Sequence, residues 1–312
     1  MSGLTIKVTS PSFSKNVTLR AELLARFPQA QFNDKGLKLE GEALVAWLSD
    51  ADAAIIGLEP ISEGILAQLP RLRMVSKFGV GLDNIDQDAC ARRGIAVGWT
   101  GGVNRRSVSE MALSLMIGLT RNLYFASRQL HNGTWNKSGG FELTGKTVGI
   151  IGVGYIGRDL AQLLKPFNCR LLANDILPPD DFYRGMNLIP ASKEEIFRTA
   201  QVVTLHVPLT AQTHHMINAE TLSMFRSDAF LINTARGALV DAEALKQALK
   251  QKKLAGAALD VYEEEPVVDA ELLALPSLIC TPHIGGSAVE AVLAMGRSAI
   301  HHLERQLAYM AA

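Results

Sequence analysis

Residues 147–157 read TVGIIGVGYIG, and this stretch decides the fold. A short apolar run leads into three glycines with the spacing GxGxxG, and a helical pattern follows at once. In that context the first glycine permits a tight turn, the second lets a pyrophosphate approach the backbone, and the third lets helix and strand pack closely. The N-terminus of the helix then offers unpaired N–H groups to the phosphates. The stretch therefore predicts a dinucleotide-binding turn made of Gly152, Gly154, Tyr155, Ile156 and Gly157.

An acidic residue follows at the expected distance. The next apolar run, CRLLAN, ends at Asp175, which is 18 residues beyond Gly157 (175 − 157). A carboxylate there accepts hydrogen bonds from both ribose hydroxyls and repels a 2′-phosphate. Because no arginine follows in NDILPPDD, the sequence predicts NAD rather than NADP as the cofactor.

Apolar runs alternate with helical patterns along most of the chain, which predicts parallel sheets covered on both faces. We therefore expect an α/β fold with two doubly wound units that meet near Trp99–Gly102. One long helix is expected over 105–131, capped by Asn104 or Ser107, with more apolar positions than one face of a domain needs. The last helical pattern, from 287 onward, is expected to cross back onto the first unit.

Composition limits the possible functions. The 312 residues suffice for two domains, and 31 basic residues balance 31 acidic ones, so no broad surface for nucleic acid is expected. The three cysteines are far apart and form no metal-ligand spacing, so we predict reduced thiols, no metal site and a cytoplasmic location. The segment MSGLTIKVTSPSF has no long apolar core, so no signal peptide is expected, and no apolar stretch is long enough to span a bilayer.

Six motifs give the chain a wider resemblance: KFGVGLDNID (77–86), GVGYIG (152–157), HVPLT (206–210), NTARGALVD (233–241), ALDVYEEEP (258–266) and TPHIGGS (281–287). Together they resemble the NAD-dependent D-2-hydroxyacid dehydrogenases, a family that includes 3-phosphoglycerate dehydrogenase, glycerate dehydrogenase and glyoxylate/hydroxypyruvate reductase. The resemblance implies a flavodoxin-like substrate domain (1–99 and 284–312) and a Rossmann-like NAD-binding domain (100–283). It also implies an active site between the domains and a homodimer.

The catalytic roles of the family fall on Arg236, Glu265 and His283. Arg236 follows the apolar run AFLIN, at the end of a strand where α/β sheets place ligands, and a guanidinium there suits a substrate carboxylate. The resemblance implies that Glu265 holds one ring nitrogen of His283, fixes its tautomer and favours its protonated form. His283 then serves as acid in reduction and as base in oxidation.

Further contacts follow from the same resemblance. The nicotinamide side of the cofactor is expected to lie against His206, Pro208, Thr234, Ala235, Asp260, Gly285 and Gly286. The N–H groups of Gly79, Val80 and Gly81 are expected to hold the substrate carboxylate, with Lys77 beside them. The remaining histidines lie in no motif and are interpreted as surface or helix residues: His131, His214, His215, His301 and His302.

Substrate choice rests on local charge. Phosphoglycerate dehydrogenases commonly carry an arginine just after the strand that corresponds to AAIIG, whereas this chain has Gly57-Leu58-Glu59-Pro60 there. Glu59 would repel a phosphate, so we predict a small unphosphorylated 2-keto acid such as glyoxylate or hydroxypyruvate. The alternatives are 3-phosphoglycerate dehydrogenase proper, a dehydrogenase of phosphite or formate, and an NAD-sensing corepressor-like protein. Because the chain lacks the regulatory extension of many phosphoglycerate dehydrogenases, control by serine is not expected.

Overall fold

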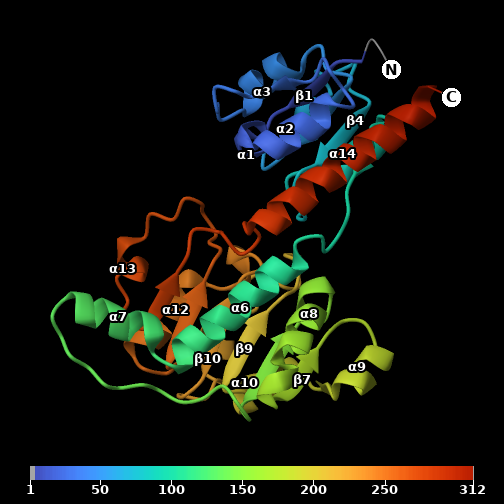
Figure 1. The fold of residues 1–312 in the computed structure, drawn as a ribbon. Helices are drawn as coiled ribbons and strands as arrows, with labels where there is room; N and C mark the ends of the chain where they lie inside the picture. The colour runs from blue at the N-terminus through green and yellow to red at the C-terminus, as the bar shows by residue number, and fades with distance from the viewer. Residues whose placement is uncertain (1–3, 312) are drawn as a thin grey trace. The chain divides into compact units, whose positions relative to one another are not determined.

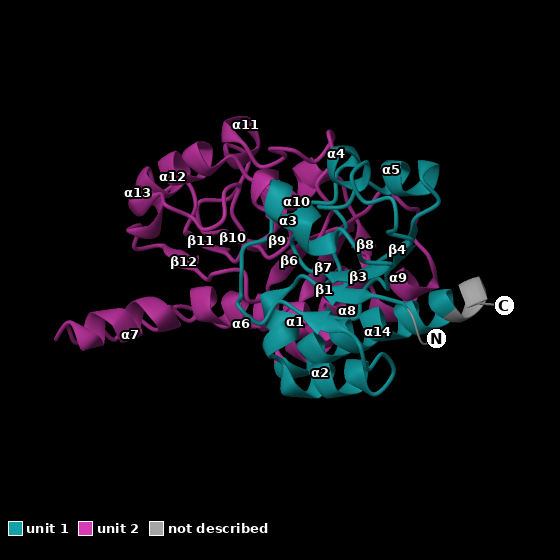
Figure 2. Ribbon diagram, turned by 90° about the horizontal axis from the view of Figure 1, so that it is seen from above, with its two compact units in different colours: residues 1–104, 289–312 teal, residues 105–288 magenta. Residues whose placement is uncertain are grey.

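The computed structural model describes residues 4–311 and divides into two compact units, which Figure 2 colours separately. Unit 1 comprises residues 1–104 and 289–312, and unit 2 comprises residues 105–288. The chain thus passes into unit 2 at residue 105 and back into unit 1 at residue 289, where the sequence had suggested 100 and 284. Residues 1–3 and 312 lie outside the described part, so the first residues of the segment considered above for a signal peptide are not described.

Unit 1 contains a five-stranded sheet in the order β2-β1-β3-β4-β5, and every neighbouring pair is parallel. This 2-1-3-4-5 order is that of flavodoxin-like folds, in agreement with the predicted fold class. The strands are β1 (Ile6–Val8), β2 (Gln31–Phe32), β3 (Ala53–Ile56), β4 (Met74–Lys77) and β5 (Ala96–Gly98).

Both faces of this sheet are covered by helices. Leu19 and Leu23 of α2 pack with Ile300 and Leu303 of α14 on one face, and α14 comes from the far end of the chain, as the sequence predicted. The other face is covered by α3, α4 and α5. The helices of unit 1 are α1 (Pro11–Lys15), α2 (Val17–Leu24), α3 (Gly41–Leu48), α4 (Glu63–Leu66), α5 (Gln87–Arg92) and α14 (Val289–Ala311).

Unit 2 contains a seven-stranded parallel sheet in the order β12-β11-β10-β9-β6-β7-β8. Counted from its first strand this is the Rossmann order 3-2-1-4-5-6 with one further strand, and the order reverses between β6 and β9. Ligands of such sheets bind outside the carboxyl ends of the strands at that reversal. The strands are β6 (Thr147–Ile151), β7 (Arg170–Asn174), β8 (Ile189–Pro190), β9 (Val202–Leu205), β10 (Phe230–Asn233), β11 (Gly256–Leu259) and β12 (Leu278–Cys280).

Two apolar cores lie on the two faces of this sheet. One contains residues of α6 and α8, and the other contains residues of α10, α11, α12 and α13 (Figure 1). The helices of unit 2 are α6 (Arg105–Thr120), α7 (Leu123–His131), α8 (Tyr155–Leu164), α9 (Asp181–Met186), α10 (Lys193–Thr199), α11 (Ala219–Leu222), α12 (Ala242–Lys250) and α13 (Ala270–Leu273), with two short 3-10 helices, η1 (Lys165–Phe167) and η2 (Gly237–Leu239).

The prediction of a single helix over 105–131 is wrong, because the structure has two helices there, α6 and α7. Asn122 is left-handed (φ 56°), and the carbonyl oxygen of Thr120 accepts the N–H of Phe141 at 2.8 Å instead of continuing a helix. A Cβ at Gly140 would lie 2.0 Å from that same oxygen, so the returning chain fits only as glycine. The predicted caps are wrong as well. The side-chain oxygen of Asn104 makes no hydrogen bond, and the hydroxyl of Ser107 donates to Gly285.

Within residues 4–311, no helix has both the length and the apolar character needed to cross a bilayer. The three cysteines, Cys90, Cys169 and Cys280, are free thiols, as the sequence predicted. Burial raises the pKa of each, so all three are protonated, poor nucleophiles.

Candidate functional site

The glycine turn follows β6 as the sequence predicted, and each glycine has its own steric reason. Gly152 has φ +97°, and a Cβ there would lie 2.6 Å from the backbone carbonyl of His206. A Cβ at Gly157 would lie 2.1 Å from the oxygen of Gly152, so only glycine at this position lets helix α8 pack this closely against the turn. Nothing lies within 4 Å of the Cβ position of Gly154, which leaves the space that a pyrophosphate requires.

Asp175 lies directly after β7 and reaches back to the glycine turn. One carboxylate oxygen accepts the N–H of Val153 at 2.6 Å, and the other accepts the N–H of Leu177 at 2.9 Å. The acidic side chain is therefore fixed next to the phosphate-binding turn, the position from which a ribose is recognised.

Two buried polar atoms near the reversal of strand order have no hydrogen-bond partner. They are Nδ1 of His206, after β9, and Oγ1 of Thr234, after β10. The other ring nitrogen of His206 lies 2.9 Å from the hydroxyl of Thr204, and burial lowers the pKa of His206 to about 3, so its ring is neutral. Unsatisfied buried polar atoms are costly unless a ligand completes them. Together with the open glycine turn, they fit a dinucleotide.

His283 and Glu265 form a hydrogen-bonded pair. Nδ1 of His283 lies 2.7 Å from Oε2 of Glu265, while Oε1 of the same carboxylate accepts the N–H of Tyr262 at 3.0 Å. With Nδ1 engaged, Nε2 is the nitrogen left to meet a substrate. His283 itself has a left-handed backbone (φ 55°) and lies in the loop that directly follows strand β12. The catalytic roles of the pair stay predictions.

Asp260 holds the loop that carries His283. It is 1 % exposed, and its carboxylate accepts hydrogen bonds from the hydroxyl of Thr281 (2.7 Å) and the N–H groups of Ile284 (2.8 Å) and Gly285 (2.7 Å). From the sequence, Asp260 was expected to lie against the nicotinamide, and this anchoring was not predicted. Ser107 was expected to cap a helix, whereas its hydroxyl donates from α6 to the oxygen of Gly285 at 2.6 Å. No local pattern signals either contact, because each partner is more than 20 residues away.

Arg236 lies between β10 and η2. Its backbone oxygen accepts a hydrogen bond from the side chain of Asn233 at 2.8 Å, and Asn233 also accepts the N–H of Ala235 at 3.0 Å. One nitrogen of the guanidinium donates to the oxygen of Ala235 at 2.7 Å. Asn233 thus shapes the turn from which the half-buried arginine projects.

The predicted substrate loop in unit 1 follows a buried lysine. Lys77 is 4 % exposed, and its ammonium donates to the oxygen of Gly57 at 2.5 Å and to Oδ1 of Asn84 at 2.6 Å. Among the hydrogen bonds of residues 4–311, none is made by the N–H groups of Gly79, Val80 and Gly81. Lys77 therefore supports the loop from inside unit 1, while three successive N–H groups are free to bind an anion.

Comparison with known proteins decides the family. The profile of the D-isomer specific 2-hydroxyacid dehydrogenase, NAD binding domain, matches residues 113–285, more than half of the chain. The chain belongs to this family. As a D-2-hydroxyacid dehydrogenase it is an NAD-dependent enzyme that transfers hydride between the cofactor and a 2-hydroxy or 2-keto acid. The family and the cofactor predicted from the sequence are confirmed.

Relatives across the dehydrogenase family agree with this assignment. The chain is 37 % identical over 260 residues to glyoxylate reductase of Pyrococcus horikoshii, covering 80 % of this chain and 78 % of the relative. It is 35 % identical over 273 residues to D-3-phosphoglycerate dehydrogenase of Methanocaldococcus jannaschii, where the match covers 86 % of this chain but only 52 % of the relative. The crystal structure of D-lactate dehydrogenase from Aquifex aeolicus, complexed with NAD and lactic acid, is similar with a TM-score of 0.85 and 25 % identity, covering 97 % of this chain and 95 % of that one.

Proposed function

We propose that the enzyme reduces a small unphosphorylated 2-keto acid, such as glyoxylate or hydroxypyruvate, with His283 as the acid. The observation that carries this proposal is the hydrogen bond between Nδ1 of His283 and Glu265, which reserves Nε2 for the substrate oxygen. Bound NADH supplies the hydride that the carbonyl carbon receives. His283 donates a proton to the oxygen of that carbonyl, and Glu265 stabilises the imidazolium from which the proton comes.

Arg236 binds the substrate carboxylate in this proposal. A guanidinium presents parallel N–H groups that match the two oxygens of a carboxylate. The shaped turn after β10 supports the assignment, because the backbone of Arg236 is held by Asn233 at 2.8 Å. The free N–H groups of Gly79, Val80 and Gly81 in unit 1 are proposed as further donors to the same carboxylate.

The preference for an unphosphorylated acid follows from Glu59. Its Oε2 accepts the N–H of Gly57 at 2.6 Å, so the carboxylate is held beside the end of β3. Related phosphoglycerate dehydrogenases place an arginine in that region, and a fixed carboxylate there disfavours a phosphate. The buried ammonium of Lys77 donates to the oxygen of Gly57 as well. We therefore propose that Lys77 supports this loop; the alternative is that its ammonium contacts the substrate directly.

The proposal is tested by measuring kcat/KM with NADH for glyoxylate, hydroxypyruvate and phosphohydroxypyruvate side by side. We expect one of the two unphosphorylated acids to be used best. In Glu59→Gln the disadvantage of the phosphorylated acid should shrink, while Glu42→Gln, an exposed carboxylate on α3, should leave the ratio unchanged. A clear preference of the unmodified enzyme for phosphohydroxypyruvate would make it a phosphoglycerate dehydrogenase instead.

We also propose a cytoplasmic homodimer in which α7 forms part of the contact. None of its residues is buried, and two of its leucines, Leu123 and Leu130, are 57 % and 55 % exposed. Beside it lies a hollow of about 410 Å³, lined by residues that include Tyr124 and Phe230. Exposed apolar surface of this kind marks interfaces. Sedimentation should give a dimer, and Leu123→Glu with Leu130→Glu should shift it toward the monomer. A monomeric unmodified protein would disprove this assembly.

A further inference from the structure

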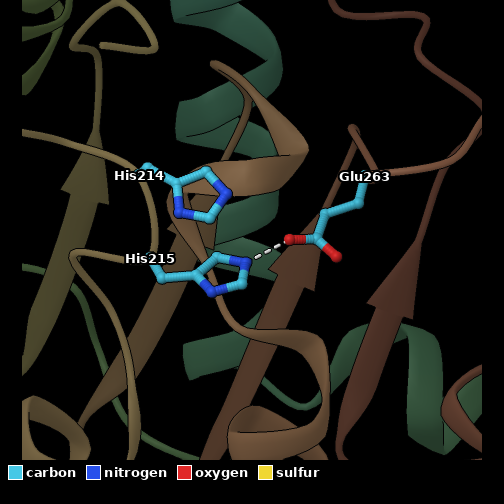
Figure 3. Close-up of side chains that lie close together, drawn as sticks. All are labelled: His214, His215 and Glu263. Carbon is cyan, nitrogen blue, oxygen red and sulfur yellow. Dashed lines mark hydrogen bonds and ion pairs between the residues drawn. The ribbon is translucent and has the colours of Figure 1, made fainter. Parts of the chain in front are cut away.

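Three side chains with metal-ligating atoms converge outside the His283–Glu265 pair. His214 and His215 lie in the turn after β9, and Glu263 lies in the segment after β11 (Figure 3). One ligand atom from each lies within 4.8 Å of the others, and Nε2 of His215 is hydrogen-bonded to Glu263. Among the described residues, this is the group of three histidine, cysteine or acidic side chains that could hold an ion.

We propose that His214, His215 and Glu263 bind one divalent transition-metal cation, with Zn²⁺ as the type case. Two imidazole nitrogens and one carboxylate oxygen form a borderline donor set, which suits Zn²⁺, Ni²⁺ or Cu²⁺. Mg²⁺ and Ca²⁺ prefer sites built from oxygen atoms alone and are not expected here. Water completes the coordination, because the histidines and the carboxylate supply three ligands at a surface that solvent reaches.

The backbones that carry these ligands are already fixed. His215 has a left-handed backbone (φ 47°), its N–H donates to the oxygen of Ala238 at 2.8 Å, and its own oxygen accepts the side chain of Asn218 at 3.0 Å. A Cβ at Gly237 would lie 2.3 Å from the backbone nitrogen of Glu263, so that segment packs directly on η2. Both ligand-bearing segments therefore rest on one short helix, and their separation is set before an ion arrives.

Only side-chain rotation is needed to complete the site. At a metal–nitrogen distance of about 2.0 Å, tetrahedral ligand atoms lie about 3.3 Å apart, so ligand atoms that now lie within 4.8 Å of one another must approach by at most about 1.5 Å. The rings of His214 and His215 are stacked with centroids 4.0 Å apart. His214 is exposed, so its ring can leave the stack with His215, and the ion takes the place of the hydrogen bond between His215 and Glu263.

A bound ion would link the turn after β9 to the segment that leads to Glu265. Glu263 stands two residues before Glu265, and η2 directly follows Arg236. Because an ion that binds only the folded chain stabilises it by mass action, occupancy should raise the melting temperature. The site is separate from the proposed acid/base pair, so its presence does not depend on the substrate assignment.

The test uses the full chain with any affinity tag removed, since a histidine tag would itself bind metal. Calorimetric titration with ZnCl₂ should show that one ion binds per chain. Thermal unfolding in the presence of ZnCl₂ should show a higher melting temperature than without it. His214→Ala should weaken binding by at least about 10- to 100-fold, the loss usual even for outer-shell partners of a metal. Glu263→Gln should weaken it as well. His301→Ala, which removes an exposed histidine on α14, should change nothing.

A second measurement identifies the ligands directly. In the electron paramagnetic resonance spectrum of one equivalent of Cu²⁺, the unmodified protein should show coupling to two imidazole nitrogens, and His214→Ala should show one. Circular dichroism of each variant checks that it is folded. If His214→Ala binds Zn²⁺ as tightly as the unmodified protein, or if the unmodified protein binds no better than the double variant His214→Ala/His215→Ala, the site does not exist.

Discussion

The buried carboxylate of Asp260 accepts the N–H of Gly285 at 2.7 Å and thereby ties the end of β11 to the loop that carries His283. The hydroxyl of Thr281 and the N–H of Ile284 donate to the same side chain. Three donors from one loop converge on an acceptor-only group, so the loop has one conformation in which all of them are satisfied. The position of the imidazole depends on this arrangement.

Asp260→Asn should therefore destabilise the protein and lower turnover together. An asparagine keeps the shape but turns N–H hydrogens toward donors of the loop, which leaves at least one buried group unsatisfied at a cost of about 1–3 kcal/mol. Denaturant unfolding and kcat measured on the same sample check this. The matched control is Asp181→Asn, an exposed carboxylate on α9, which should behave as the unmodified enzyme. Full stability in Asp260→Asn would show that the loop does not need this anchor.

Replacement of the acid itself should affect chemistry and not cofactor binding. His283→Ala should lower kcat by about two to four orders of magnitude, the usual contribution of a positioned general acid. The affinity for NADH, followed by fluorescence, should change little, because the glycine turn and Asp175 lie elsewhere in unit 2. His301→Ala, which removes an exposed histidine on α14, serves as the control. Near-normal turnover in His283→Ala would mean that another group supplies the proton.

The partner of the imidazole should affect the rate of the chemical step. In Glu265→Gln, His283 loses the anion that lies 2.7 Å from Nδ1 and holds its ring, so Nε2 is no longer fixed for the substrate oxygen. The kcat of reduction should therefore fall. Glu264→Gln removes the neighbouring exposed carboxylate and should leave kcat unchanged. An unchanged kcat in Glu265→Gln would exclude a role of this residue in holding the ring.

Cofactor choice should depend on one carboxylate. Asp175 is fixed at the glycine turn by its bond to the N–H of Val153, where it would meet a 2′-phosphate with like charge. Removing a repulsion of about 1–4 kcal/mol corresponds to a factor of roughly five or more. The ratio of kcat/KM for NADH over NADPH should therefore fall by at least that factor in Asp175→Ser. It should stay constant in Asp181→Ser, and equal use of both cofactors by the unmodified enzyme would contradict the prediction.

The neutral ring of His206 predicts a loss of stability in acid. Burial lowers its pKa from 6.5 to about 3 in the folded chain, so below pH 6.5 the unfolded chain takes up a proton that the folded chain does not. The stabilisation is complete above pH 6.5 and is lost as the pH falls toward 3, by an amount on the order of a few kcal/mol. His206→Gln should flatten this part of the stability curve, and His301→Gln, an exposed control, should not.

The sequence predicted the fold class, the cofactor turn and the alternation of strands and helices, because these depend on local patterns. It failed where distant segments decide. The break between α6 and α7 depends on Gly140, which approaches Thr120 from 20 residues away. The anchoring of the His283 loop depends on Asp260, and the metal-site candidate joins His215 to a carboxylate 48 residues later. Lys77 was expected beside the substrate carboxylate, yet its ammonium donates to Gly57 and Asn84 inside unit 1.

The contribution of α14 to unit 1 has a consequence for biosynthesis. Leu303 and Leu307 complete the core around Ile6, Ile55 and Met74, yet they are made after all of unit 2. Chains emerge from the ribosome N-terminus first, so all five strands of unit 1 are synthesised while one face of their sheet still lacks its longest helix. Unit 2, which is continuous, has every residue it needs before that helix is translated. Unit 2 should therefore reach its native state first, with unit 1 left open to chaperones until α14 has been synthesised.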